Sequence, residues 1–198
     1  IIMNDGVKVD KLDVKGLDVK RSSFPKAFQD IMADVLISIL RGDTELQLSD
    51  KILSFKKRMT DYEIKDVAKN SAVKELTKYM GKKRQPFQVE KGSPAHVKAA
   101  IAYNDLLKHF DVPFKYEPMG NGDKVKWVYL KENPLNLDGL AFTGYKDPPE
   151  IIDFIAKYID HNKIFERELK GKLQDFFTAV GWGDVVSEQR TAEKFFTF

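Results

Sequence analysis

Apolar residues recur at helical spacing along six stretches of this sequence, and this pattern restricts the fold more than any other feature. In the clearest stretch, a hydroxyl residue, Ser23, precedes Pro25, and Gly42 follows the last apolar position. Ser and Pro are typical of a helix start and Gly of a helix end, so the sequence predicts a helix capped by Ser23. The same spacing predicts further helices over 45–59, 71–80, 94–110, 149–159 and 161–180.

Short β-rich segments lie between the predicted helices. An Asn-Asp-Gly turn in 1–14 and a Gly-Asn-Gly turn in 114–130 each predict a β-hairpin, and 61–69 alternates enough for a short strand. We therefore expect an α+β fold, mostly helical, with small antiparallel β-hairpins. The first hairpin has a short first arm, so we expect the chain to continue a longer or split polypeptide.

The charge of the chain is balanced but unevenly distributed. Its 33 Lys and Arg against 30 Asp and Glu give a net charge of only +3. Segment 81–98 is mostly basic, whereas 147–160 is mostly acidic. Only this distribution can argue for a nucleic-acid partner, because the net charge is too small to do so.

Several classes of protein are excluded by residues that the sequence lacks. There is no cysteine, hence no disulfide or thiolate chemistry, and no apolar run of about 20 residues to span a membrane. We expect a cytoplasmic protein with no membrane partner. The histidines His96, His109 and His161 are scattered, and no GxxxxGK[ST] motif occurs. We therefore predict no catalytic residue, metal site or cofactor within this chain.

Two predicted helix starts concentrate cations and hydroxyl groups. Around the first lie Lys20, Arg21, Ser22, Ser23 and Lys26. A helix start offers unpaired N–H groups and a positive dipole, so this stretch could hold a phosphate. The alternative is a capped helix with solvated lysines, and this stretch alone does not decide between them.

The second helix start repeats the pattern. Lys91 precedes a Gly-Ser-Pro turn, and His96 and Lys98 follow in the first helical turns. Two such starts in one chain favour contacts with the backbone of a nucleic acid. Tyr103, further along this helix, is expected to be a core residue rather than a ligand.

The chain ends in three aromatic residues after a polar stretch, Phe195, Phe196 and Phe198. They could fold back onto the body of the protein. They could equally insert into a pocket on a partner, because exposed aromatic side chains at a terminus are costly without one.

Several of these segments together resemble one protein family. The run KLDVKGLDVKRSSFPKAFQ resembles the palm-to-thumb junction of family B replicative DNA polymerases of T-even-type phages. GSPAHVKAAIAYN and IFERELKGKL are similar to two segments of the thumb in that family, and the short Phe-rich end is similar to its clamp-binding peptide. The resemblance extends over essentially the whole chain.

The resemblance implies a division into the end of a palm (1–20), a thumb (21–186) and a tail that binds a sliding clamp (187–198). It implies that the thumb grips primer–template duplex DNA through backbone phosphates, with Arg167 as a further contact. Lys98 replaces an arginine of the family, so a bidentate phosphate contact becomes a point charge.

The resemblance also places the catalytic carboxylates and their Mg²⁺ ions in an upstream palm, which the fingers and exonuclease parts would accompany. This chain alone would then not polymerise, and it would act in the cytoplasm of a host cell if a phage encodes it. Two alternatives stay open at this stage: a free-standing interaction module with solvated basic loops, and a natural subunit of a split DNA polymerase.

Overall fold

The computed structural model describes residues 2–4, 7–9, 21–81, 85–112 and 114–185. The α-helices are α1 (Lys26–Arg41), α2 (Glu45–Lys57), α3 (Ile64–Val67), α4 (Leu76–Met80), α5 (Ala95–His109), α6 (Pro149–Tyr158), α7 (His161–Ile164) and α8 (Lys170–Ala179). The strands are β1 (Ile2–Asn4), β2 (Val7–Val9), β3 (Lys69–Ala72), β4 (Lys124–Tyr129) and β5 (Gly139–Phe142). A 3-10 helix, η2 (Met59–Asp61), and a π-helix, η3 (Phe165–Leu169), complete the assignment. The predicted α+β, mostly helical fold is confirmed.

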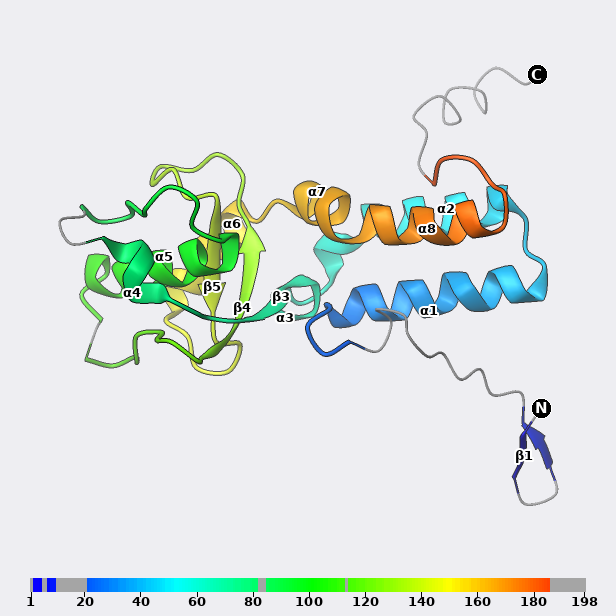
Figure 1. Ribbon diagram of the computed structural model, residues 1–198, viewed down its shortest axis with the longest axis horizontal. Coiled ribbons are helices and arrows are strands. Elements are labelled where there is room, and N and C mark those ends of the chain that lie inside the picture. The colour runs from blue at the N-terminus through cyan, green and yellow to red at the C-terminus, as the bar shows by residue number, and fades with distance from the viewer. Residues whose placement is uncertain (1, 5–6, 10–20, 82–84, 113, 186–198) are drawn as a thin grey trace.

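Residues 21–185 form two halves. Helices α1, α2 and α8 lie side by side in one half, while α4, α5 and the sheet formed by β3, β4 and β5 lie in the other (Figure 1). The segment α7–η3 runs from the sheet toward α8, so the second half joins the first without a long linker. This arrangement brings residues from the beginning, middle and end of the chain to one junction.

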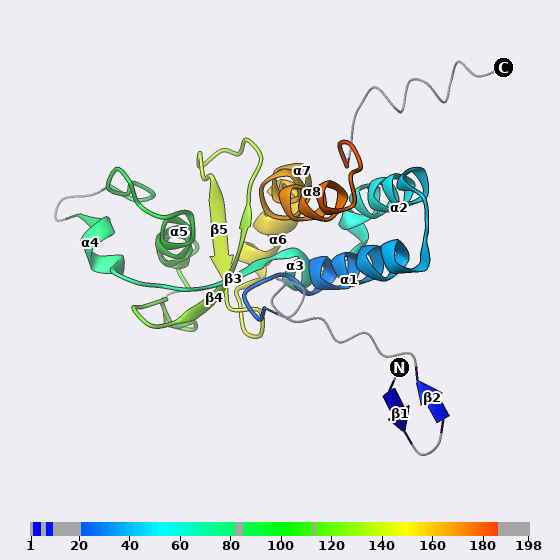
Figure 2. The same ribbon diagram turned by 45° about the vertical axis from the view of Figure 1, so that its right-hand side comes forward.

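The sheet at this junction is antiparallel, in the order β3-β4-β5. Trp127 in the central strand pairs with Lys69 on one side and Ala141 on the other. Figure 2 shows α5 on one side of the sheet and α6 and α7 on the other. Because both faces are covered, β4 and β5 carry mostly buried side chains rather than a strict alternation.

Packing explains why the two longest helices form where the sequence predicted them. α1 buries one apolar face, including Phe28, Ile31 and Val35, and ends at Gly42 in the left-handed conformation. α5 buries residues almost all round its circumference because it lies between the sheet and the loops that cover it. The predicted helices over 45–59 and 149–159 are also confirmed, as α2 and α6.

Two predictions for residues 61–80 were wrong. Residues 61–69 do not form a strand, since most of them lie in η2, α3 and their connections. The predicted helix over 71–80 shrinks to α4, because Ser71 and Ala72 pair with β4 and Glu75 takes a left-handed conformation (φ 53°). A helix cannot pass through a left-handed residue, so α4 begins only at the next position.

The predicted hairpin over 114–130 is half right. Its second arm is β4, but the strand partners of β4 are β3 and β5 rather than 114–119. Asn104 on α5 instead holds this segment, donating to the carbonyl oxygen of Met119 (2.8 Å) and accepting from its N–H (2.7 Å). Strand β5 was not predicted from the sequence.

The N-terminal hairpin agrees with the prediction, and the last predicted helix agrees in part. β1 and β2 pair antiparallel, as predicted. The predicted helix over 161–180 is continuous in direction but divides into α7, η3 and α8. Residues 10–20 and 186–198 lie outside the described residues, so the predicted domain boundaries stay predictions.

Candidate nucleic-acid interface

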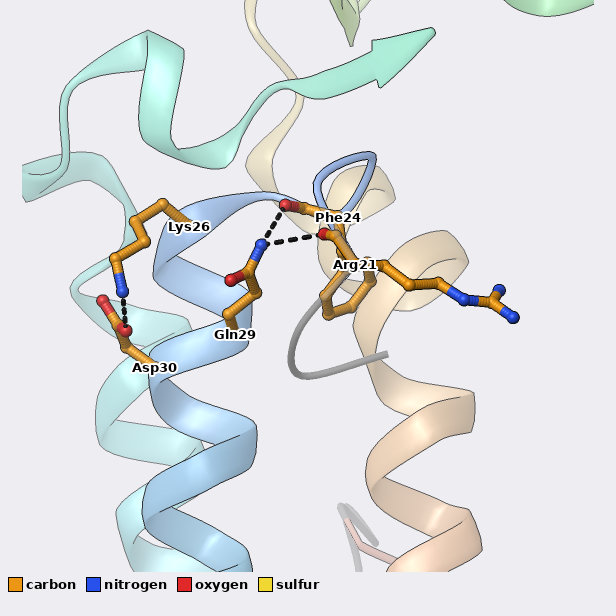
Figure 3. Close-up of polar contacts among 5 residues, drawn as sticks. All are labelled: Arg21, Phe24, Lys26, Gln29 and Asp30. Atoms are coloured by element: carbon orange, nitrogen blue, oxygen red, sulfur yellow. Dashed lines mark hydrogen bonds and ion pairs between the residues drawn. The ribbon is translucent and has the colours of Figure 1, made fainter. Parts of the chain in front are cut away.

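The first predicted phosphate site is a tight turn that α1 itself holds in place. The N–H of Phe24 donates to the carbonyl of Arg21 (2.9 Å). The side-chain amide of Gln29 donates to the carbonyl oxygens of both residues, at 2.9 and 2.8 Å (Figure 3). Phe24 is buried, whereas Arg21, Ser22 and Ser23 are exposed, so the turn presents its cation and hydroxyl groups outward.

The expected cap at this helix start was wrong. α1 begins at Lys26 after Pro25, and no side chain caps it. Instead, the hydrogen bonds from Gln29 to the preceding turn fix the position at which the chain enters α1. The hydroxyl group of Ser23 is therefore not occupied as a helix cap.

Strand β3 supports the same turn from the other side. The side-chain amide of Asn70 donates to the carbonyl of Ser22 (2.8 Å), and its backbone N–H donates to that of Ser23 (3.3 Å). The ammonium of Lys126 in turn donates to the side-chain oxygen of Asn70 (3.0 Å). The turn is thus fixed by hydrogen bonds to both α1 and the sheet.

A pocket of about 630 Å³ opens beside this turn, and we call it the junction pocket. Four cations line it, against two acids. One acid, Glu168, is paired with Lys69 at 2.7 Å, and the ammonium of Lys172 lies 5.5 Å from the ring centre of Phe24. The junction pocket is lined by Arg21, Ser23, Phe24, Lys69, Asn70, Ser71, Arg167, Glu168, Gly171, Lys172 and Asp175.

A second pocket of about 380 Å³ lies next to the first, and we call it the sheet pocket. Lys98 from the second predicted phosphate site and Lys163 line it, and Arg167 lines both pockets. The guanidinium of Arg167 forms no hydrogen bond or ion pair with any other described residue. Arg21, Ser23, Lys98 and Arg167, which are distant in sequence, therefore line two pockets that share Arg167.

A charged network forms part of the walls of the two pockets. Glu168 pairs with Lys69 and also accepts a hydrogen bond from the Tyr129 hydroxyl (3.0 Å). Burial, followed by the negative charge of Glu168, raises the pKa of Tyr129 to about 12, so its hydroxyl stays protonated and donates. The ammonium of Lys69 also lies 5.4 Å from the ring centre of Trp127, which holds it at the junction.

His96 is placed near the same network. Burial lowers the pKa of His96 below 6.5, and the positive charge of Lys69 lowers it further. The imidazole is therefore neutral at neutral pH. Its contribution to a phosphate site would be a hydrogen bond rather than a charge.

Three other predicted residues, Lys26, Lys91 and Ser22, do not line the two pockets. Lys26 forms an ion pair with Asp30, and Figure 3 shows it on the opposite side of α1 from Arg21. Lys91 is exposed but lines neither pocket, and Ser22 contributes its carbonyl to Asn70 rather than a pocket wall. Lys20, Phe195, Phe196 and Phe198 lie outside the described residues.

Four residues that line these pockets were not predicted from the sequence: Lys69, Asn70, Lys163 and Lys172. Lys69 and Asn70 were not identified because the sequence predicts a separate strand over 61–69. In the structure, β3 begins at Lys69 and contacts the turn before α1. Lys163 and Lys172 sit on the polar side of predicted helices, where a solvated lysine is the ordinary expectation. No local motif marks them.

The described ranges contain neither a metal-binding cluster nor a membrane-spanning helix. No group of three or more His, Asp or Glu side chains among these residues is arranged to hold a metal ion. Within the same residues, no helix is both long and apolar enough to cross a bilayer.

Comparison with known proteins adds one finding. No protein-family model matches the chain. Over 173 residues, however, the chain is 25% identical to the DNA-directed DNA polymerase of Enterobacteria phage T4. The chain is similar to part of a DNA polymerase. The match covers 86% of this chain but only 18% of the phage protein, so this chain spans less than a fifth of its relative.

This similarity tests only one of the predictions made from the sequence. It confirms the expected relationship to a DNA polymerase. A thumb, a sliding clamp and family B of the phage enzymes remain predictions.

Proposed function

We propose that this chain is the thumb portion of a phage-type family B DNA polymerase and grips primer–template duplex through backbone phosphates. The single observation that carries the proposal is the convergence of Arg21, Ser23, Lys98 and Arg167 on two adjoining pockets. Similarity to a DNA polymerase makes a nucleic acid the favoured partner for such a surface.

The chemistry of these side chains suits phosphate oxygens. Guanidinium groups bind them in a bidentate manner, ammonium groups bind as point charges, and serine hydroxyls donate single hydrogen bonds. All of these contacts are independent of base identity, so the grip would show no sequence preference. In the proposal, polymerisation itself takes place in a palm, where carboxylates hold Mg²⁺ ions in line with the reacting groups.

Duplex affinity at several salt concentrations tests the proposal. The logarithm of affinity should fall with the logarithm of salt, with a slope of about −0.9 per phosphate contact. Arg167→Ala should weaken binding roughly two- to five-fold and make the slope about 0.9 less steep. Arg41→Ala is the matched control, because Arg41 is exposed at the other end of α1 and lines neither pocket.

Two results would contradict the proposal. Affinity that barely changes with salt would favour the free-standing interaction module with solvated basic loops. Equal effects of Arg167→Ala and Arg41→Ala would show that cations bind DNA without using the two pockets.

We also propose that Phe195, Phe196 and Phe198 tether the chain to a sliding clamp. Deleting 195–198 should abolish clamp binding and leave the melting temperature almost unchanged. A marked fall in the melting temperature would instead assign these rings to the core.

A further inference from the structure

A third pocket lies in the half of the molecule that contains the sheet, between α5, the loop before β4 and the loop after β5. Its volume is about 590 Å³, and it shares no lining residue with the junction or sheet pockets. We call it the aromatic pocket because four rings line it. Its lining includes Tyr103, Phe114, Tyr116, Tyr145, Lys124 and Lys146.

The walls of the aromatic pocket are held rigidly. Asn104 fixes one wall through its two hydrogen bonds to Met119. Asp147 fixes the other, accepting from the N–H of Thr143 (2.6 Å), the hydroxyl of Thr143 (2.9 Å) and the N–H of Gly144 (2.8 Å). The Thr143 oxygen also accepts from the N–H of Lys146 (3.2 Å), so the position of the loop is set before any ligand arrives.

These rigid loops expose two large rings to solvent. Tyr145 is 88% exposed and Phe114 is fully exposed, more than any other large apolar side chain in the described chain. Single exposed apolar residues are ordinary, but two rings at the mouth of one pocket form a platform for a ligand. A flat aromatic group could stack on either ring.

A buried hydroxyl group adds a second, independent observation. Tyr103 is fully buried, and its hydroxyl has no hydrogen-bond partner among the described residues. Burial is the largest cause of a raised pKa for Tyr103. The charge of Asp147 and the nearby hydroxyl groups of Tyr116 and Tyr145 raise this pKa further. The group is thus a neutral donor beside the rings of the pocket. Leaving such a group unpaired costs about 1–3 kcal/mol, which a ligand atom could recover.

The charges at the rim favour an anionic ligand. Neither Lys124 nor Lys146 forms an ion pair within the described residues. Of the two acids that line the pocket, Asp123 is engaged by the N–H of Gly120 (2.7 Å), and Glu117 is exposed. Stacking rings beside free lysines are the combination that binds single-stranded nucleic acid.

We propose that the aromatic pocket binds a nucleotide of a single-stranded nucleic acid. The base stacks on Tyr145 or Phe114 and accepts a hydrogen bond from Tyr103, and Lys124 and Lys146 contact the phosphate. This site is separate from the duplex-binding surface proposed above, and it goes beyond that function.

The test is the affinity of the 198-residue chain for a short fluorescein-labelled oligothymidylate, measured by anisotropy. Tyr145→Ala should weaken binding at least roughly five-fold, as expected for the loss of one stacked base. Tyr62→Ala is the matched control, since Tyr62 is the other exposed tyrosine of the described residues, at 37%, and it lies against Phe55 and does not line this pocket. Equal effects of the two substitutions would overturn the proposal.

Tyr103→Phe tests the hydroxyl separately. It should weaken oligothymidylate binding while leaving the melting temperature unchanged or higher, because a buried unpaired hydroxyl is removed. Unchanged affinity in both Tyr103→Phe and Tyr145→Ala would overturn the proposal and leave an aromatic-rich peptide as the occupant to consider.

Three further arms identify the ligand and separate this proposal from the duplex proposal. An abasic strand should bind more weakly than oligothymidylate, and equal binding would exclude base stacking. Thymidine monophosphate should compete at high concentration, and failure to compete would overturn a nucleotide site. Arg167→Ala should weaken duplex binding only. If it weakens strand binding while Tyr145→Ala does not, the strand lies on the duplex surface and the aromatic pocket is not its site.

Discussion

The two helix starts that look alike in sequence differ in how the fold uses them. Both α1 and α5 begin directly after a proline, and neither has a side-chain cap. Before α1, Ser23 is exposed and lines the junction pocket, whereas before α5, Ser93 is buried and its hydroxyl donates to the carbonyl of Glu90. The first start therefore offers its hydroxyl to a ligand, and the second uses its hydroxyl to close a turn.

A basic, hydroxyl-rich helix start is therefore a local pattern with two outcomes. Which outcome occurs depends on a distant segment. At α1, Asn70 from β3 holds the turn by its carbonyl groups and leaves the side chains outward. At α5, the loop folds back so that the N–H of Glu90 donates to the carbonyl of Tyr79 (2.9 Å), which buries part of the approach to the helix.

The largest effect should come from removing the anchor of the first start. Asn70→Ala removes the side-chain bond to Ser22 and leaves Lys126 without its acceptor at this position. We expect a loss of about 2 kcal/mol in the free energy of unfolding, measured by urea denaturation, together with weaker duplex binding. Asn162→Ala is the control, because Asn162 is exposed and no hydrogen bond of its side chain is found among the described residues. An equal loss in both variants would show that Asn70 is not a specific anchor.

An intermediate effect should separate the two serines. Ser93→Ala should cost about 1 kcal/mol of stability and leave duplex affinity unchanged, because its hydroxyl is buried and bonded within the turn. Ser23→Ala should do the reverse, with nearly unchanged stability and weaker binding. Urea denaturation and duplex titration of the same two samples measure both quantities, and identical behaviour would erase the distinction between the helix starts.

A smaller effect should distinguish the two cations flanking the first start. Arg21→Ala should weaken duplex binding roughly two- to five-fold, the range expected for one exposed charge. Lys26→Ala should leave affinity almost unchanged, because Lys26 pairs with Asp30 on the other side of α1. Titration of both variants at one salt concentration is sufficient, and a larger effect of Lys26→Ala would contradict the assigned orientation.

The smallest effect should come from pH. The pKa of His96 is lowered by burial and then by Lys69, and that of His161 by burial and then by Lys131. Below pH 6.5 the unfolded chain therefore binds protons before the folded chain does, so stability is complete above about 6.5 and falls as pH decreases toward the folded pKa values.

Urea denaturation between about pH 7.5 and 5 measures this loss. A double variant, His96→Gln with His161→Gln, should lose less stability over that interval than the unsubstituted protein. Parallel curves for the two proteins would mean that other groups govern the pH dependence.

Most helices could be predicted from the sequence because their pattern is local. Apolar residues recur at helical spacing in α1, α2, α5 and α6, and prolines mark the starts of α1, α5 and α6. The strands could not be assigned in the same way. Paired residues of β3 and β4 are more than 50 positions apart in the sequence. The sequence around either strand therefore does not identify its partner strand. The prediction of a local hairpin over 114–130 failed for this reason.

The candidate interface was predictable in part. Arg21, Ser23, Lys98 and Arg167 came from local patterns and from a family resemblance, and the structure places them around adjoining pockets. Lys69 and Lys172 reach the same surface only because β3 and α8 pack beside the first turn, and that packing leaves no mark in nearby residues. Tyr103 was correctly expected to be buried, but its unpaired hydroxyl depends on how the rest of the fold packs around it.

The π-helix η3 has a consequence for how this surface tolerates change in length. A π turn accommodates one residue more than the α-helical repeat, and each α-helical residue turns the axis by about 100°. Deleting a single residue within 165–169 would restore regular winding and rotate everything before it by that angle relative to α8. Glu168 would then lose its ion pair with Lys69 and its hydrogen bond from Tyr129, or Arg167 would no longer line the two pockets. We therefore expect a one-residue deletion within 165–169 to preserve the helix but to remove side-chain contacts at the junction between the two halves.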